Sequence, residues 1–358
     1  MTSYKILAIN PGSTSTKIAV YENEQWVCGK SIRHERQELG RFAEVAHQYE
    51  FRRDLIIKEL EENNISLSGF SAIVGRGGLL KPIPSGVYEV NQTMLDDLFH
   101  GRQGEHASNL GGLIAHDLAK QIPGCKAYIA DPVVVDELQS VARISGHPAF
   151  ERISIFHALN QKAVAKNYAR EINRAYESLH LVIAHLGGGI SVGAHCKGRV
   201  IDVNNALDGD GPFSPERSGA LPAYALAKWC FSGNVTLEKV HRMIVGEGGM
   251  VAHLGTNQFT TVCDWVGEGR SDARLIFDAM AYNVAKSIGA MAVVLKGNVD
   301  AILITGGMSY SALFVAQIKE QVAFLAPVKV YPGEDEMVAL AMNGLAVLKG
   351  EETPKVYQ

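Results

Sequence analysis

The chain has 358 residues, of which 47% are hydrophobic and 20% are charged, and its formal net charge is −4 at pH 7. This length exceeds the usual size of one hydrophobic core, so two domains are expected. The small negative charge excludes a general attraction to nucleic acid or to anionic membranes. The sequence shows neither the pattern of a signal peptide nor an apolar run of the ~20 residues that a membrane span needs.

The five cysteines are scattered along the chain and form no C-x-x-C pair. This spacing argues against a disulfide framework or a zinc site and favours a reducing compartment. We therefore expect a cytoplasmic protein that binds neither nucleic acid nor membranes.

Residues 1–150 predict an N-terminal α/β domain. It opens with a strand over Lys5–Asn10, a turn over Pro11–Ser15 and a second strand over Thr16–Tyr21. The further elements expected here are a strand near Trp26, a helix over 41–62, a strand over 70–74, a helix over 106–121 and a strand over 127–130. Loop-like residues at 145–148 indicate the domain boundary.

Residues 151–337 predict a second α/β domain. A helix over 158–176 leads to a strand over 181–185, a glycine turn, a strand over 190–195, a polar turn and a strand over 200–203. This order repeats the opening of the chain. The remaining elements expected are a strand over 301–305, a helix over 311–324, a strand over 328–331 and a helix over 336–348. We expect residues 338–358 to pack back onto the first domain.

The repeated strand–turn–strand unit, together with strands separated by helices, predicts a duplicated α/β fold with a cleft between its halves. A chance resemblance between two β-turns is the alternative explanation of the repeat.

The first turn gathers polar groups that suit phosphate oxygens: Asn10, Ser13, Ser15 and Lys17 surround Gly12. Glycine lets the backbone approach a ligand, and consecutive N–H groups and hydroxyls can then bind phosphate. An ordinary β-hairpin with a Ser/Thr-rich turn fits the composition equally well. The turn is not a P-loop, because the G-x-x-x-x-G-K-[ST] pattern is absent.

Two further glycine turns follow buried strands. Gly187, Gly188 and Gly189 come after the strand that ends at His185, and three successive glycines there favour phosphate binding over a tight hairpin. Gly306, Gly307 and Met308 follow the strand over 301–305, at the strand end where open α/β sheets bind ligands.

Charged groups in loops complete the candidate site. Arg76 and Arg217 lie in loops, and a guanidinium suits carboxylate and phosphoryl oxygens, although most arginines are surface residues. Asp131 ends a strand and could reach Mg²⁺ through water. Glu336 belongs to an acidic segment that equally suits the dipole of the last helix. His157 could bind a phosphoryl group or be a core residue.

Three segments resemble one known family, the acetate and butyrate kinases of the actin-like ATPase superfamily. Residues 6–17, I-L-A-I-N-P-G-S-T-S-T-K, resemble its first phosphate signature, in which Asn10 is the acyl-kinase version of a common aspartate. Residues 184–189, A-H-L-G-G-G, resemble the second phosphate loop, and residues 304–308, I-T-G-G-M, resemble the adenosine loop. The segments occur in the family's order and span essentially the whole chain.

The resemblance implies duplicated actin-like, ribonuclease H-like domains, the cofactors ATP/ADP and Mg²⁺, and a homo-oligomer. It implies a catalytic set of Arg76, Arg217, His157 and Asp131. The residues implied for nucleotide binding are Asn10, Ser13, Ser15, Lys17, His185, Gly187, Gly188, Gly189, Asn257, Gly306, Gly307 and Met308. Those implied for Mg²⁺, partly through water, are Asn10, Asp131 and Glu336.

The sequence departs from the acetate branch beside the first arginine. Acetate kinases read H-R-V-V-H-G-G there, whereas this chain has Gly77 after Arg76. The smaller residue would enlarge an acyl pocket, so the chain is similar to the butyrate branch, and the reaction implied is reversible transfer from ATP to butyrate. A branched acid such as isobutyrate fits the same argument, and acetate or propionate remain alternatives.

Because a carboxylate is already ionised at pH 7, the implied reaction needs no general base, only positioning and charge stabilisation of a direct in-line transfer. A sugar kinase would need an aspartate that acts as general base toward the acceptor hydroxyl, and Asp131 is the sole candidate. A non-enzymatic nucleotide switch would hydrolyse ATP slowly without an acceptor.

Overall fold

The computed structural model describes residues 3–358, apart from the side chain of Arg36. The chain divides into two compact units, unit 1 with Met1–Val135 and Asp335–Gln358, and unit 2 with Asp136–Glu334. Each unit has its own β-sheet and its own hydrophobic core. Within residues 3–358, helices of membrane-spanning length and apolarity are absent.

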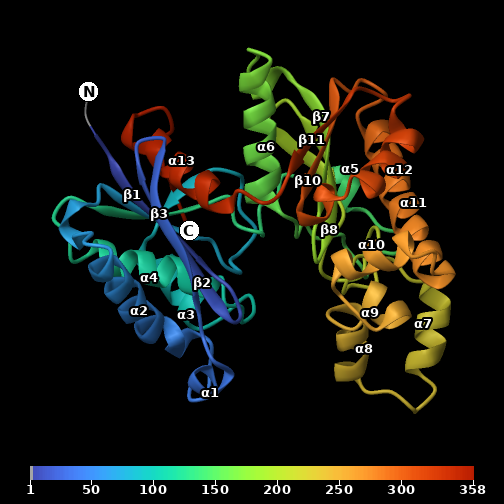
Figure 1. The fold of residues 1–358 in the computed structure, drawn as a ribbon, viewed down its shortest axis with the longest axis horizontal. Helices are drawn as coiled ribbons and strands as arrows, with labels where there is room; N and C mark the ends of the chain where they lie inside the picture. The colour runs from blue at the N-terminus through green and yellow to red at the C-terminus, as the bar shows by residue number, and fades with distance from the viewer. Residues whose placement is uncertain (1–2) are drawn as a thin grey trace. The chain divides into compact units, whose positions relative to one another are not determined.

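Unit 1 is built on a seven-stranded sheet in the order β12-β5-β6-β4-β1-β2-β3 (Figure 1). β1, β2 and β3 form an antiparallel meander, and β4 and β6 add to it in parallel. The strands are β1 (Lys5–Pro11), β2 (Ser15–Glu22), β3 (Gln25–Arg33), β4 (Ala72–Arg76), β5 (Val87–Glu89), β6 (Lys126–Ala130) and β12 (Lys355–Val356). The helices are α1 (Arg36–Leu39), α2 (Tyr49–Glu62), α3 (Gln92–Phe99), α4 (Asn109–Ala119) and α13 (Glu336–Leu348).

The central strand β1 is buried on both faces, as its uninterrupted apolar run indicates. Leu7 and Ile9 belong to the core that α2, α3 and α4 cover. Ile6 lies on the opposite face with Val74 of β4, where α13 crosses the sheet. A methyl group on Gly344 of α13 would lie 2.6 Å from Val74, so glycine allows this close approach of helix and sheet.

Unit 2 repeats the same arrangement in its five-stranded sheet, β11-β10-β7-β8-β9 (Figure 1). β7, β8 and β9 form the meander, and β10 and β11 add to it in parallel. This order matches β6-β4-β1-β2-β3 strand for strand, so the predicted duplicated α/β fold is confirmed. The strands are β7 (His180–Leu186), β8 (Ile190–Cys196), β9 (Arg199–Val203), β10 (Ala301–Gly306) and β11 (Val328–Pro332).

The faces of β7 alternate in the same way as those of β1. Val182 and Ala184 lie in the core with α11 and α12, and Leu181 and Ile183 pack against α6 on the other face. The helices of unit 2 are α5 (Ser140–Arg143), α6 (Ala158–Glu171), α7 (Ala223–Cys230), α8 (Leu237–Ile244), α9 (Gly249–Leu254), α10 (Phe259–Gly267), α11 (Ser271–Val294) and α12 (Ala312–Val322).

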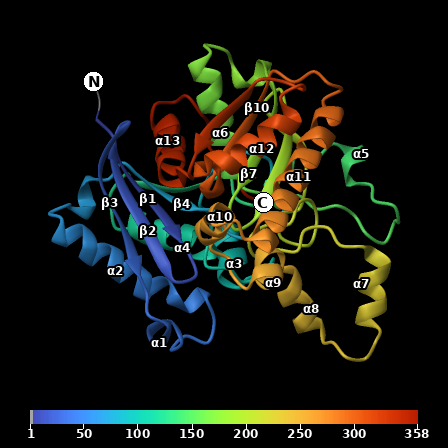
Figure 2. The same ribbon diagram turned by 45° about the vertical axis from the view of Figure 1, so that its right-hand side comes forward.

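Helices α7 and α8 lie at the margin of unit 2 (Figures 1 and 2). α7 buries none of its side chains. Tyr224 is 83% exposed, Phe231 91% and Leu237 85%. Apolar side chains are therefore displayed here without a covering element among the described residues.

The units divide at Val135/Asp136 and at Glu334/Asp335, whereas the sequence analysis places the boundaries at 150 and 337. Residues 136–150 belong to unit 2 because polar contacts hold them there. Glu137 pairs with the buried Lys162 at 2.7 Å, and the backbone N–H of Gln139 donates to the carbonyl of Ile201.

Two expected helices are shorter than their apolar spacing indicates. The helix expected from residue 41 begins at Tyr49, and the ring of Phe42 instead packs against Phe51 with centroids 5.8 Å apart. The helix expected to reach residue 176 ends at Glu171, because Asn173 adopts a left-handed backbone conformation with φ of 54°.

Candidate functional site

In unit 1, three predicted residues converge at the strand ends. Asn10 lies on β1 beside β4, which ends at Arg76, and Glu336 begins α13. Nδ2 of Asn10 donates to Oε2 of Glu336 at 2.5 Å, and Nη1 of Arg76 lies 3.2 Å from the same oxygen. Nη1 of Arg76 also donates to Oδ1 of Asn10 at 3.3 Å. One carboxylate therefore holds the amide and the guanidinium together.

The predicted phosphate turn between β1 and β2 lies above a buried arginine that the sequence analysis did not single out. Arg52 of α2 is 1% exposed, and its Nη1 donates to the carbonyls of Gly12 and Ser15 at 2.7 and 3.2 Å. Its Nη2 donates to the carbonyl of Ser13 at 3.4 Å. With its carbonyls bound from below, the turn presents the exposed Ser13 side chain to solvent, and exposed Lys17 pairs with Asn10 across the two strands.

Burial shifts the pKa values of two groups beneath this turn. It lowers the pKa of Arg52 to about 10, where the guanidinium is still charged at neutral pH. The pKa of His34, whose Nε2 lies 2.8 Å from Oγ1 of Thr16, falls to about 4, first because of burial and then because Arg52 is positive. His34 is therefore neutral at pH 7.

Asp131 follows β6 and is 2% exposed. Its φ of 37° is a left-handed value that is uncommon outside glycine. Oδ1 accepts a hydrogen bond from Oγ of Ser85 at 2.6 Å and from the backbone N–H of Gly86 at 2.9 Å. This carboxylate therefore secures the neighbouring loop, which is a structural task in addition to any contact with a ligand.

The acyl-kinase resemblance implies Mg²⁺, and the chemistry of the donors in unit 1 fits a hard cation. Glu336 and Asn10 offer carboxylate and amide oxygens, the ligand types that Mg²⁺ prefers, and Mg²⁺ usually takes only one or two protein carboxylates beside phosphate and water. Within residues 3–358, groups of three or more His, Cys, Asp or Glu side chains able to enclose a metal are absent. The two donors of unit 1 therefore fit the oxygen preference of Mg²⁺.

In unit 2, the three glycines after β7 are packed by charged side chains. A methyl group on Gly189 would lie 2.1 Å from Nη1 of Arg217, and one on Gly188 would lie 3.4 Å from Oε1 of Glu216. A methyl group on Gly187 would lie 2.9 Å from Oε1 of Glu334. The guanidinium of Arg217 thus fills the space that a side chain at position 189 would occupy.

Arg217 is held in this position by polar contacts. Its Nη1 donates to the carbonyl of Ala206, and its backbone N–H donates to Oγ of Ser214, which in turn donates to the carbonyl of Gly188 at 2.5 Å. Burial lowers the pKa of Arg217, and the charges of Glu216 and Asp208 oppose that shift. Its Nε is buried and makes no hydrogen bond within residues 3–358, so the guanidinium keeps unused donor capacity for an anion.

The two predicted histidines of unit 2 stack on each other. The ring centroids of His157 and His185 are 3.8 Å apart and the ring planes differ by 11°. Nδ1 of His157 lies 2.8 Å from Oγ of Ser191, and Nδ1 of His185 lies 2.7 Å from Oδ1 of Asn160. Nε2 of His185 lies 3.1 Å from Oε1 of Glu334, which is an ion pair when the ring is protonated.

The predicted adenosine loop adjoins this glycine turn, because Thr305 of β10 pairs with His185 of β7. Gly306 has φ of 93°, and a methyl group there would lie 2.3 Å from the carbonyl oxygen of Leu186, so only glycine fits. Gly307 borders open space. Met308 is buried in the core, which leaves its backbone for any nucleotide contact.

Asn257 follows α9 in an exposed loop, and its Nδ2 donates to Oε2 of Glu216 at 3.2 Å. Since Glu216 also adjoins Gly188, Asn257 is linked to the glycine turn through one carboxylate. The structure thus gathers the unit 2 candidates at the ends of β7 and β10, and the unit 1 candidates at the ends of β1, β4 and β6.

Sequence reasoning missed several residues that organise these groups: Arg52, Asn160, Gln161, Ser191, Ser214 and Glu216. Glu216 and Ser214 stand beside Arg217 in the sequence, which was the available signal. Arg52, Gln161 and Ser191 carry none, because they lie within regular elements and reach their partners only through the fold.

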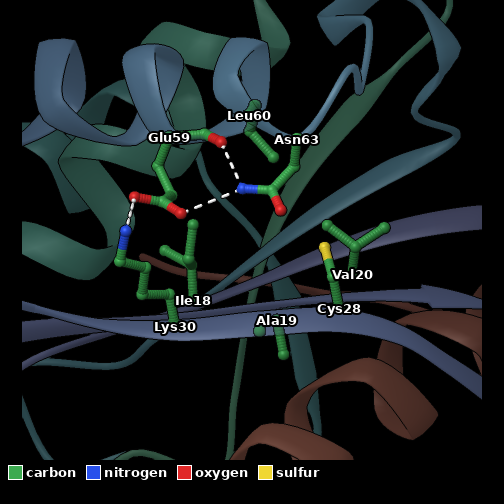
Figure 3. A pocket seen from close by; sticks show the side chains of 9 residues that line it. Ile18, Ala19, Val20, Cys28, Lys30, Glu59, Leu60 and Asn63 are labelled. Atoms are coloured by element: carbon green, nitrogen blue, oxygen red, sulfur yellow. Dashed lines mark hydrogen bonds and ion pairs between the residues drawn. The ribbon is translucent and has the colours of Figure 1, made fainter.

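A separate cavity of about 250 Å³ lies in unit 1 between α2 and strands β2 and β3 (Figure 3). Lys30 pairs with Glu59 at 2.6 Å, and Asn63 donates to the same carboxylate at 2.9 Å, so the polar groups at its edge satisfy one another. The side chain of Cys28 also faces it, and burial raises the pKa of that thiol. The sequence-predicted site residues do not line this cavity.

Comparisons with known proteins add the following. The model of the Acetokinase family matches residues 152–336. The chain is 54% identical over 355 residues to butyrate kinase 2 of Clostridium acetobutylicum, covering 99% of each chain. It is 54% identical over 354 residues to a probable butyrate kinase of Bacteroides thetaiotaomicron, covering 99% of this chain and 100% of that one.

The fold is similar to that of acetate kinase from Porphyromonas gingivalis, with a TM-score of 0.78 and 17% identity, covering 96% of this chain and 100% of that one. At this identity the likeness shows the fold alone. Together with the two repeated sheets, it confirms the predicted actin-like ATPase fold.

Proposed function

The chain belongs to the acetokinase family, and on that basis we propose that it transfers the γ-phosphoryl group of ATP to the carboxylate of butyrate, giving butyryl phosphate and ADP. The choice of butyrate is supported by 54% identity, over almost the full length of both chains, to a butyrate kinase. Glycine at position 77 adds no support, because a methyl group there would lie 2.5 Å from Cβ of Pro132, so this structure has Pro132 where the sequence predicted a larger acyl pocket.

The observation that carries the proposal is the fit of Arg217 against the glycine turn. A half-buried arginine whose buried Nε makes no hydrogen bond within residues 3–358, lying beside the exposed Gly188 and the buried Gly189, is suited to an anion that carries charge on several oxygens. Although burial lowers its pKa, an arginine starts so far above neutrality that it stays charged.

The acyl group requires no general base, because its carboxylate is ionised at pH 7. The obstacle is repulsion between two anions. We assign Arg76 to the acyl carboxylate, Arg217 to the phosphoryl oxygens, and His157 as a hydrogen-bond donor to the phosphoryl group. In unit 1, Glu336 holds the Arg76 guanidinium at 3.2 Å until the acyl carboxylate replaces or joins it.

We assign the nucleotide phosphates to His185, Gly187, Gly188 and Gly189 and to the Asn10–Lys17 turn with Ser13 and Ser15. The adenosine would contact Gly306, Gly307, the backbone of Met308 and Asn257. Glu336 and Asn10, with Asp131 through water, would hold Mg²⁺, which when bound neutralises charge on the phosphate oxygens. The transfer is direct and in line, and it is reversible because an acyl phosphate is itself a strong phosphoryl donor.

The acid preference is tested with a panel of linear and branched C2 to C6 acids, ATP and Mg²⁺, by trapping the acyl phosphate with hydroxylamine. We expect the highest kcat/KM for butyrate. A maximum at isobutyrate would move the assignment to a branched-chain kinase, and a maximum at acetate would overturn the choice of butyrate.

We also propose a homo-oligomer and a cytoplasmic location. The exposed side chains of Tyr224 in α7 and of Phe231 directly after it support the first, because large exposed apolar side chains favour contact with another chain. The five free cysteines support the second. Sedimentation of the purified protein tests the oligomer, and a monomer at all concentrations would contradict it.

A further inference from the structure

A series of hydrogen bonds, which we call the relay, runs through the interior of unit 2 to His157. The hydroxyl oxygen of Tyr176 lies 2.7 Å from Nδ1 of His195, and Nε2 of His195 lies 2.9 Å from Oε1 of Gln161. Nε2 of Gln161 donates to Oγ of Ser191 at 2.9 Å, and that oxygen lies 2.8 Å from Nδ1 of His157. Gln161, Ser191 and His195 are fully buried, so water cannot replace any of these bonds.

One backbone group determines which atoms donate and which accept along the relay. The amide of Gln161 also contacts the carbonyl oxygen of Ser191 at 3.1 Å. A carbonyl can only accept, so the amide atom at this position must be the nitrogen. The amide oxygen of Gln161 then faces His195 and requires a proton on Nε2 of that ring.

His195 is consistent with this direction. Complete burial, and then the positive charge of Lys162, lower the pKa of His195 well below its ordinary value, so the ring is neutral and carries one proton. With that proton on Nε2, Nδ1 of His195 accepts from the hydroxyl of Tyr176.

The same logic sets the hydroxyl of Ser191. Its oxygen accepts from Nε2 of Gln161 and, at 3.5 Å, faces the backbone N–H of His157. Its own proton is therefore directed to Nδ1 of His157, at 2.8 Å. A ring that accepts at Nδ1 carries its proton at Nε2 when it is neutral.

We propose that Gln161 and Ser191 are positioning residues that hold neutral His157 as the Nε2–H tautomer. This deepens the proposed function and rests on it for the purpose of the proton, which is to donate to a phosphoryl oxygen. The opposite tautomer would present a lone pair at Nε2, and a lone pair repels an anionic oxygen. The relay thus determines whether His157 attracts or repels the group in transfer.

The tautomer can be measured without turnover. In the full-length protein labelled with ¹⁵N-histidine, long-range ¹H–¹⁵N spectra distinguish protonated from unprotonated ring nitrogens, and a His157→Gln variant identifies the signals of His157. We expect Nε2 protonated and Nδ1 unprotonated above the titration range of the ring. A proton on Nδ1 in the wild-type protein would overturn the proposal.

Variants distinguish an effect on the His157 tautomer from a general loss of structure. Ser191→Ala should lower kcat by about 10- to 100-fold, the usual loss when a hydrogen-bond partner of a functional side chain is removed. It should also give a mixture of His157 tautomers. Ser191→Thr retains the hydroxyl and should restore the Nε2–H signal. Ser287→Ala, which deletes a hydroxyl bonded to the carbonyl of Asn283 at 3.1 Å, is the matched control and should change neither readout.

The outcomes distinguish this proposal from the proposed function. If the wild-type tautomer is Nε2–H but His157→Gln retains full kcat, the relay stands and the catalytic role of His157 fails. If His157→Gln is inactive but Ser191→Ala keeps both the tautomer and kcat, the relay is wrong and the catalytic role stands. Gln161→Met, which keeps the side-chain length, repeats the test should Ser191→Ala fail to fold.

Discussion

The substitution Gly189→Ala tests the fit between the glycine turn and Arg217 without removing the guanidinium. The added methyl group would lie 2.1 Å from Nη1, and an ordinary contact begins at 3.4 Å, so the guanidinium must move away. A displacement of about 1 Å at a reacting group costs on the order of 10²-fold in rate. We therefore expect kcat to fall by about 10²-fold, approaching the loss for removal of a charged donor.

The fold should tolerate this change. The backbone of Gly189 is not left-handed, and the clashing atom is the end of a side chain. Crowding of this kind typically costs about 1–3 kcal/mol of unfolding free energy. Trapping butyryl phosphate as the hydroxamate gives kcat, and urea denaturation gives the stability.

Two variants serve as controls. Gly289→Ala, at a glycine of α11 where an added methyl group would have no atom within 4 Å, should keep the wild-type kcat. In an Arg217→Ala background the space is vacant, so adding Gly189→Ala should have little further effect on kcat. Equal losses from Gly189→Ala with and without Arg217 would refute the reasoning.

Three further predictions concern unit 1. Arg52→Lys should lower the unfolding free energy by about 3 kcal/mol and raise KM for ATP, because a lysine leaves carbonyls of the phosphate turn unpaired; unchanged urea denaturation would contradict this. Glu336→Gln should raise the Mg²⁺ concentration for half-maximal activity, measured by Mg²⁺ titration, while an unaltered titration would exclude Glu336 as a ligand. The unfolded chain binds a proton at His34 near pH 6.5 but the folded chain only near 4, so His34 stabilises the fold above pH 6.5 and loses this contribution as pH falls toward 4. His34→Asn should reduce the change of unfolding free energy with pH by at most about 1.4 kcal/mol per pH unit. Urea denaturation at pH 7 and pH 5 measures this change, and a variant that loses as much unfolding free energy between the two pH values as the wild type would contradict the prediction.

The glycine turns could be predicted because each directly follows a buried strand in the sequence. The run of Leu181–His185 fixes where β7 ends, and parallel pairing with β10 then brings Gly306 beside the turn after it. The duplicated sheets follow from the same local signal, since strand, turn and strand recur in both halves. The expected ends of β1 and β10 accordingly lie within one residue of those observed.

The polar contacts could not be predicted, because they join residues that are distant in sequence. Gln161 and Ser191 are 30 positions apart, and neither side chain is unusual in a helix or strand. Arg52 occupies a helix in which an arginine is ordinarily exposed, and only the fold brings it under the turn 40 residues earlier. Residues 204–299 gave no expected elements, because helices α7 to α10 are short and α11 is hydrophobic on more than one side.

The most direct test of carboxyl phosphorylation is the stoichiometry of ADP and acyl hydroxamate formed from ATP, Mg²⁺ and hydroxylamine. With butyrate we predict one butyrohydroxamate for each ADP, and almost no ADP when butyrate is omitted or replaced by glucose. Formation of ADP at the same rate without a carboxylate, or with glucose as the acceptor, would contradict it.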